Sequence, residues 1–66
     1  MDYELDIVIP VYNEGAVILD TLGALIESNQ TPFRALVCYD HDDDNTLAAI
    51  KDGPDGIRDR VVFVKN

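Results

Sequence analysis

Two short polar segments carry the residue types that could bind a ligand. The first, Tyr12-Asn13-Glu14, follows the β-branched run Ile7-Val8-Ile9 and Pro10. The second, Asp40 to Thr46, follows the apolar residues 35–38. An aromatic ring can stack on a planar group, and amide and carboxylate oxygens can accept hydrogen bonds from its N–H and O–H groups. The two segments therefore predict a binding site for a small polar ligand.

The strands that must position these segments are predicted by short apolar runs. Ile7-Val8-Ile9 is typical of a buried parallel strand, and it should end near Pro10 because proline donates no ladder hydrogen bond. Further strands are expected at about 33–39 and at 61–64, with a turn at 53–56. A β-α-β-α-β order predicts an α/β fold with a parallel three-stranded sheet. Such sheets bind ligands at the carboxyl ends of their strands.

Two helices are expected between the strands. The first spans Gly15 to about Ser28, with Asn13 as its N-cap. Its apolar face follows the helical i, i+4, i+7, i+8 spacing and consists of Ile18, Leu22, Leu25 and Ile26. The second spans roughly Thr46 to Lys51, with Asp44 or Asn45 as its cap.

Length, charge and cysteine content narrow the class of protein. The 66 residues, 47% of them hydrophobic, predict one small globular domain. The 13 acidic and 5 basic residues disfavour binding to nucleic acid phosphates. No apolar run has the ~20 residues of a membrane span, and no signal peptide is evident. Cys38 is the only cysteine and is expected to be buried in a strand. We expect a cytoplasmic protein without nucleic-acid or membrane partners.

The acidic segment 40–46 permits three interpretations. An EF-hand loop has acidic ligands at its odd positions, as here, but Asn45 stands where glycine is needed and Lys51 where glutamate is needed. A haloacid-dehalogenase-like phosphotransferase carries Asp-x-Asp-x-Thr/Val after its first strand. Here the segment follows the second strand, and Asp44 replaces the threonine or valine.

The third interpretation takes both polar segments together. Residues 9–14, Ile-Pro-Val-Tyr-Asn-Glu, followed by a helix, a strand and the segment 39–47, resemble the start of family 2 glycosyltransferases of the GT-A fold. Those enzymes typically read Pro-x-Tyr-Asn-Glu after a hydrophobic strand, and Asp-Asp-Gly-Ser-x-Asp-x-Thr after the next strand. The second motif departs from this pattern at Tyr39, His41 and Asp42. It is matched at Asp40, Asp44 and Thr46.

The resemblance implies the three-stranded βαβαβ half of a Rossmann-like, nucleotide-binding GT-A sheet, with strand order 3-2-1. It implies that Pro10 and Tyr12 line the pocket for the base of a UDP- or GDP-sugar. Glu14 would accept hydrogen bonds from the ribose, and Asp40 would accept one from a ring N–H of the base.

The resemblance also limits the activity expected of this chain. The family's metal-binding Asp-x-Asp and its general base lie beyond residue 66, so no catalytic residue, metal ligand or cofactor is expected within residues 1–66. Mg²⁺ or Mn²⁺ is expected for the full-length enzyme. The chain is thus expected to be the N-terminal part of one GT-A domain, inactive alone and binding nucleotide-sugar weakly.

Other features of the loop and sheet allow further expectations. Asp44 should cap the second helix, Asp42 and Asp43 should be solvated, and His41 should either be exposed or line the pocket. Right-handed crossovers in one direction place both helices on one face of the sheet. The apolar strands would then leave a bare face and a free edge, which favours a homo-oligomer, in the simplest case a two-fold dimer. An acidic association module without a ligand is the alternative function.

Overall fold

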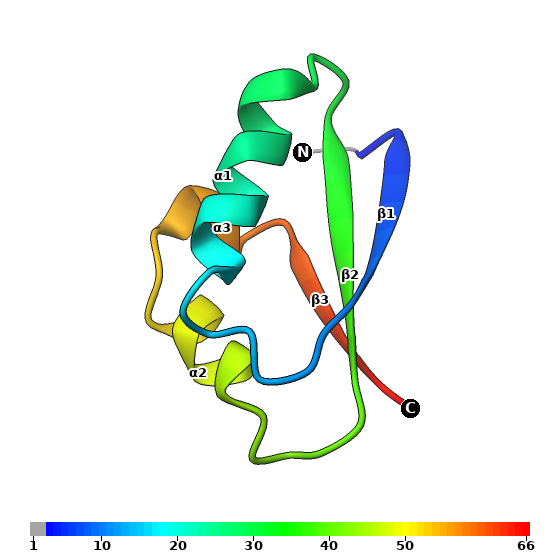
Figure 1. The fold of residues 1–66 in the computed structure, drawn as a ribbon. Helices are drawn as coiled ribbons and strands as arrows, with labels where there is room; N and C mark the ends of the chain where they lie inside the picture. Colours follow the sequence, from blue (N-terminus) through cyan, green and yellow to red (C-terminus); the bar gives the residue numbers. More distant parts are fainter. Residues whose placement is uncertain (1–2) are drawn as a thin grey trace.

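The computed structural model describes residues 3–66, which form a three-stranded parallel sheet with helices on one of its faces (Figure 1). The strands are β1 (Leu5–Pro10), β2 (Phe33–Tyr39) and β3 (Val61–Lys65). Their order is β1-β2-β3, so β2 is central and pairs in parallel with both neighbours. Read from the β3 edge, the same neighbours follow one another as 3-2-1. The α/β class expected from the sequence is confirmed.

The first helix, α1, spans Ile18–Ser28 and begins three residues later than expected. The amides of Val17 and Ile18 both donate to the Glu14 carbonyl, at 3.0 and 2.9 Å, so a turn precedes the helix. The prediction that Asn13 caps α1 is wrong. Val17 occupies the cap position without a side-chain bond, while Asn13 adopts a positive φ of 48° further back.

The second helix, α2, spans Asn45–Lys51 and has Asp44 as its N-cap. The Asp44 carboxylate accepts a hydrogen bond from the Thr46 amide at 2.8 Å, so the capping role expected for Asp44 is confirmed. The turn expected at 53–56 is only partly right, because the helical turn α3 (Asp55–Arg58) begins inside it. Pro54 precedes α3 with φ −62°, which suits a helix start.

The hydrophobic core lies between the sheet and the helices. Alternate residues of the central strand, Phe33, Ala35 and Val37, are at most 1% exposed and face this core. The other buried apolar residues are Val11, Ile18, Leu22, Leu47 and Ile50. The helices therefore cover one face of the sheet, as the crossover argument predicted. Within residues 3–66, no helix is long and apolar enough to cross a membrane.

The opposite side of the sheet, which we call the helix-free face, carries the remaining strand residues. Its apolar members are Val8, Leu36, Cys38, Val62 and Val64. Val8 is 62% exposed, although the sequence pattern suggested strands covered on both sides. Cys38 is half-buried here and less enclosed than expected. At one end of this face, Arg34 forms a bidentate ion pair with Asp6.

Candidate functional site

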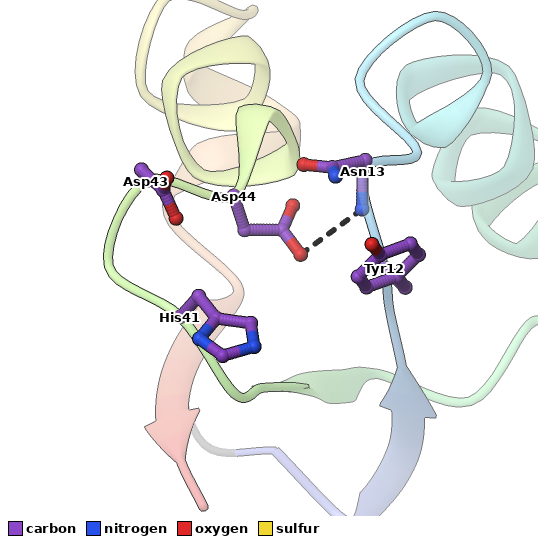
Figure 2. A pocket seen from close by; sticks show the side chains of 5 residues that line it. All are labelled: Tyr12, Asn13, His41, Asp43 and Asp44. Carbon is purple, nitrogen blue, oxygen red and sulfur yellow. Dashed lines mark hydrogen bonds between the residues drawn. The ribbon is translucent and has the colours of Figure 1, made fainter.

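The two polar segments meet at the carboxyl edge of the sheet, at the bottom of Figure 1. The connection from β1 to α1 and the connection from β2 to α2 lie side by side there and enclose a pocket of about 280 Å³. Figure 2 shows its lining side chains, which are Tyr12, Asn13, His41, Asp43 and Asp44. The predicted convergence of the two segments is therefore confirmed.

Three consecutive side chains, those of the N-cap and the first two residues of α2, bind three consecutive backbone amides of the first loop. Asp44 Oδ2 accepts from the Asn13 amide at 3.0 Å. Asn45 Oδ1 accepts from the Gly15 amide, and Thr46 Oγ1 from the Glu14 amide, both at 2.8 Å. We call the side chains of Asp44, Asn45 and Thr46 the loop clamp.

A fourth bond runs in the opposite direction. The amide of Asn45 donates to Asn13 Oδ1 at 3.1 Å. This bond uses the side chain that had been expected to cap α1. It accompanies the left-handed backbone of Asn13, a conformation that asparagine tolerates better than most residues. The side chain of Asn13 thus joins the two loops.

The fit between the loops is close at Gly15. A Cβ atom at this position would lie 2.8 Å from the carbonyl oxygen of Asn45 and 2.9 Å from its Oδ1 atom. Cβ atoms in proteins do not lie this close to an oxygen atom, so any larger residue at position 15 would force the loops apart. Glycine is required here by the approach of Asn45 and not by its own backbone angle.

Asp44 is the most enclosed charged group of the site, with 6% of its surface exposed. Hydrogen bonds from the Thr46 side chain, the Asn13 amide and the Thr46 amide lower the pKa of its carboxyl, against a smaller opposing effect of burial. The nearby charge of His41 lowers this pKa as well. The carboxylate is therefore ionised at neutral pH and fully engaged in holding the loops.

Tyr12 differs from its neighbours because its side chain is 71% exposed. The backbone around it is nevertheless fixed, since the amide of Val11 donates to the Cys38 carbonyl at 2.9 Å and the amide of Asn13 donates to Asp44. Figure 2 shows the ring at the end of β1, beside the pocket. An exposed aromatic ring on a fixed backbone is suited to stacking against a planar ligand.

Of the four residues expected to bind nucleotide, the structure places only Tyr12 in the pocket lining. Pro10 ends β1 opposite Cys38. Glu14 is exposed, and its amide belongs to the clamped segment. Asp40 is also exposed, and it accepts a hydrogen bond from the Asn66 side chain at 3.0 Å.

Four other residues line the pocket, and the sequence had left only His41 open as a candidate for it. Asp44 had been expected only to cap the second helix, which it also does. The open question about His41 is answered, because its ring faces the pocket. Asn13 had been assigned to a helix cap, although an asparagine in a loop after a strand also signals a tight turn with positive φ. Asp43 had been expected only to be solvated. The position of Asp43 depends on a turn in which the Asp44 amide donates to the His41 carbonyl, and no residue pattern in the sequence marks this turn.

The acidic residues 40–44 are the candidate metal ligands of this region. Within residues 3–66, no three histidine, cysteine, aspartate or glutamate side chains come together in a way that could hold a metal ion. Asp42 instead pairs with Lys65 at 2.9 Å. This finding does not test the Mg²⁺ or Mn²⁺ expected for the full-length enzyme, which stays a prediction.

Comparison with known proteins agrees with the two motifs at this edge of the sheet. The family model for glycosyl transferase family 2 matches residues 6–66, which include both strands and both loops that form the pocket. No curated protein and no solved structure gives a significant match to the chain. The family match covers nearly the whole sequence, and the chain therefore belongs to glycosyl transferase family 2.

Proposed function

We propose that the pocket between the two loops binds the base and ribose of a nucleotide-sugar donor, UDP- or GDP-linked. In this proposal the chain is the nucleotide-binding part of a GT-A glycosyltransferase domain. The observation that carries it is the exposed ring of Tyr12, held on a fixed backbone at the junction of the two motif loops. Membership of the family supports a nucleotide-sugar as the ligand class.

The size and charge of the pocket favour the neutral part of such a donor. Its volume of about 280 Å³ is just below the range for ligand pockets, ~300 to 1,000 Å³, which suits a nucleoside better than a whole nucleotide-sugar. Its lining includes the carboxylates of Asp43 and Asp44, which would repel a diphosphate. The diphosphate and the sugar would therefore extend out of the pocket.

The remaining residues suggested by the family motif would act at the rim. Asp40 directly precedes His41, which lines the pocket, so its carboxylate could accept a hydrogen bond from a ring N–H of the base. Glu14 would accept hydrogen bonds from the ribose hydroxyls, and Pro10 would support the ring of Tyr12. The Asn66 amide would then have to exchange places with the base at Asp40.

We propose that this chain alone binds donor nucleotide weakly and does not transfer sugar. The contacts above reach only the base and ribose, and the charge-assisted bonds that strengthen diphosphate binding have no counterpart among them. Metal-dependent sugar transfer by the purified chain would overturn this part of the proposal.

Titration of the ¹⁵N-labelled chain with UDP and GDP, followed by NMR, tests the proposal. We expect chemical-shift changes at Tyr12, Asn13, His41 and Asp40 at millimolar nucleotide, with pyrophosphate as the control that lacks a base. Changes with pyrophosphate alone would indicate simple anion binding. The absence of changes with either nucleotide would reject the pocket and favour the association module.

A second proposal, self-association, rests on the helix-free face. The strand register places Leu36 beside both Val8 and Val62, and Cys38 beside Val64, so the apolar side chains form two adjacent rows. We propose that a second copy packs against these rows in a two-fold dimer. Three strands spaced about 4.8 Å apart make a narrow face, smaller than the ~800 Å² per partner of a standard interface, so weak association is expected.

A further inference from the structure

We propose that Asn45 is a positioning residue for nucleotide binding, which acts by fixing the loop that carries Tyr12. This inference rests on the proposed function, because it concerns how the same pocket attains its affinity. Asn45 does not line the pocket. Its effect would therefore be transmitted through the backbone of the first loop.

The first loop is held by hydrogen bonds to residues far along the chain. Residues 13–15 make four hydrogen bonds with residues 44–46, although 30 to 32 residues of chain separate the partners. Asn45 takes part in two of these bonds, because its side-chain Oδ1 accepts from the Gly15 amide and its backbone amide donates to Asn13 Oδ1. Only the side-chain bond would be lost on substitution by alanine.

The position of the Tyr12 ring depends on how firmly this loop is held. The Tyr12 side chain is 71% exposed, so little protein surrounds it, and its position is set by the backbone on either side. The Val11 amide of that backbone donates a hydrogen bond to β2, and the amides of Asn13 and Gly15 donate to side chains of the loop clamp. Loss of the clamp bond to Gly15 would leave the ring free to sample more orientations. Binding would then have to order it, which reduces affinity.

Loss of the Asn45 side chain should weaken binding and leave the fold intact. Asn45 is exposed, and the bond from the Gly15 amide is exposed as well. Solvent can replace the acceptor in the free protein, so the fold should tolerate its removal. Asp44 and Thr46, which are 6% and 0% exposed, would be poorer choices because their substitution leaves buried groups unpaired.

The test compares Asn45→Ala with Asn45→Asp, which keeps an acceptor oxygen at the same place. The probes are uridine and guanosine, whose lack of charge removes any effect of the added carboxylate. We expect Asn45→Ala to weaken nucleoside binding about five- to tenfold, in line with the loss of one hydrogen bond, and Asn45→Asp to restore it to within about twofold. Thermal melting should show both variants folded.

A second measurement reports on the loop without any ligand. In Asn45→Ala, NMR relaxation should show increased fast motion of the amides of residues 12–15, with the rest of the chain unchanged. The matched control is Asn29→Ala, which removes a comparable side-chain amide bond, from Asn29 to the Leu25 carbonyl at 2.8 Å, in the segment that follows α1. This control should alter neither nucleoside affinity nor motion in residues 12–15.

The outcomes separate this inference from the proposed function. Wild-type protein that binds neither nucleoside nor nucleotide would overturn the proposed function, and with it the role of Asn45 in binding. Wild-type protein that binds, together with an Asn45→Ala variant of equal affinity or an Asn45→Asp variant as weak as Asn45→Ala, would overturn the inference alone. Unchanged loop motion in Asn45→Ala would also reject it.

Discussion

The carboxylate of Asp44 joins two loops that are far apart in sequence, because its Oδ2 atom accepts a hydrogen bond from the Asn13 amide at 3.0 Å while its Oδ1 atom accepts one from Thr46 at 2.8 Å. A single ionised side chain thus caps α2 and fixes the end of the first motif. The two acceptor oxygens of the carboxylate allow it to do both, one bond on each oxygen. This double role explains why an almost fully buried charge is compatible with the fold.

Acid should weaken the fold through Asp44. Its pKa in the folded state lies below the ordinary value of 3.8, so the carboxylate contributes stability that is fully present above pH ~4 and is lost as the pH falls through the folded-state pKa. We expect Asp44→Asn to melt at a lower temperature than wild type near neutral pH. The difference should shrink as the pH is lowered below ~4.

Thermal melting followed by circular dichroism from about pH 7 to pH 2 measures this difference. Asp43→Asn is the matched control, since Asp43 is an exposed neighbour and should give no such pH-dependent gap. A gap between Asp44→Asn and wild type that stays constant over the whole range would contradict the assignment.

Gly15 and Gly23 should respond in opposite ways to alanine. At Gly15 the new Cβ would meet the Asn45 carbonyl oxygen at 2.8 Å, and forcing the loops apart should cost about 1 to 3 kcal/mol. At Gly23, inside α1, no atom lies within 4 Å of the new Cβ, so alanine should stabilise the helix by about 0.5 to 1 kcal/mol. Urea unfolding of both variants measures the two changes. Equal destabilisation of both would argue against the close contact at Gly15.

Much of the fold was predictable because it follows from local patterns. The short apolar runs indicated all three strands, and β2 was predicted with its observed bounds. The apolar spacing indicated the buried face of α1, but this pattern does not mark where a helix begins. The start of α1 depends on the turn at Glu14, whose carbonyl accepts from two amides and so delays the helix.

The site was predictable only in part, because its bonds join residues distant in sequence. The two motifs indicated which loops would meet, and the side chain of Tyr12 lies in the lining between them. Its role in binding a nucleotide stays a prediction. The pairing of Asn45 with Gly15 could not be predicted, since it depends on how β1 and β2 are aligned in the sheet and on the path of both loops. Neither the alignment nor the path is encoded by residue type alone.

Removal of the Tyr12 ring should weaken nucleotide binding without affecting the fold. Base–aromatic stacking contributes about 1 to 3 kcal/mol, so Tyr12→Ala should raise the Kd for UDP or GDP about tenfold or more. Because the side chain is 71% exposed, the melting temperature should hardly change. Tyr12→Phe keeps the ring and should bind almost as wild type does. If titration showed Tyr12→Ala binding as tightly as Tyr12→Phe, stacking by this residue would be rejected.

Asp40→Asn should reduce nucleotide affinity if the carboxylate accepts a hydrogen bond from the base. The amide can present a donor where the base also donates, so one favourable contact would become unfavourable. Asp42→Asn is the matched control, since it removes the same charge two residues away, where the carboxylate pairs with Lys65. Titration of both variants with UDP and GDP measures the effect. Equal affinities for Asp40→Asn and wild type would remove Asp40 from the site.

Self-association through the helix-free face should depend on its apolar rows and on ionic strength. Val8→Asp would place a charge among them and should abolish dimer formation, whereas Val17→Asp, at a residue 52% exposed before α1, should not. Since each copy carries a net charge of −8, added salt should screen the repulsion and strengthen the wild-type dimer. Sedimentation velocity at rising micromolar concentrations, at low and high salt, measures these effects. A wild-type protein that stays a folded monomer under all these conditions would reject the dimer, and equal behaviour of the two variants would place the contact elsewhere.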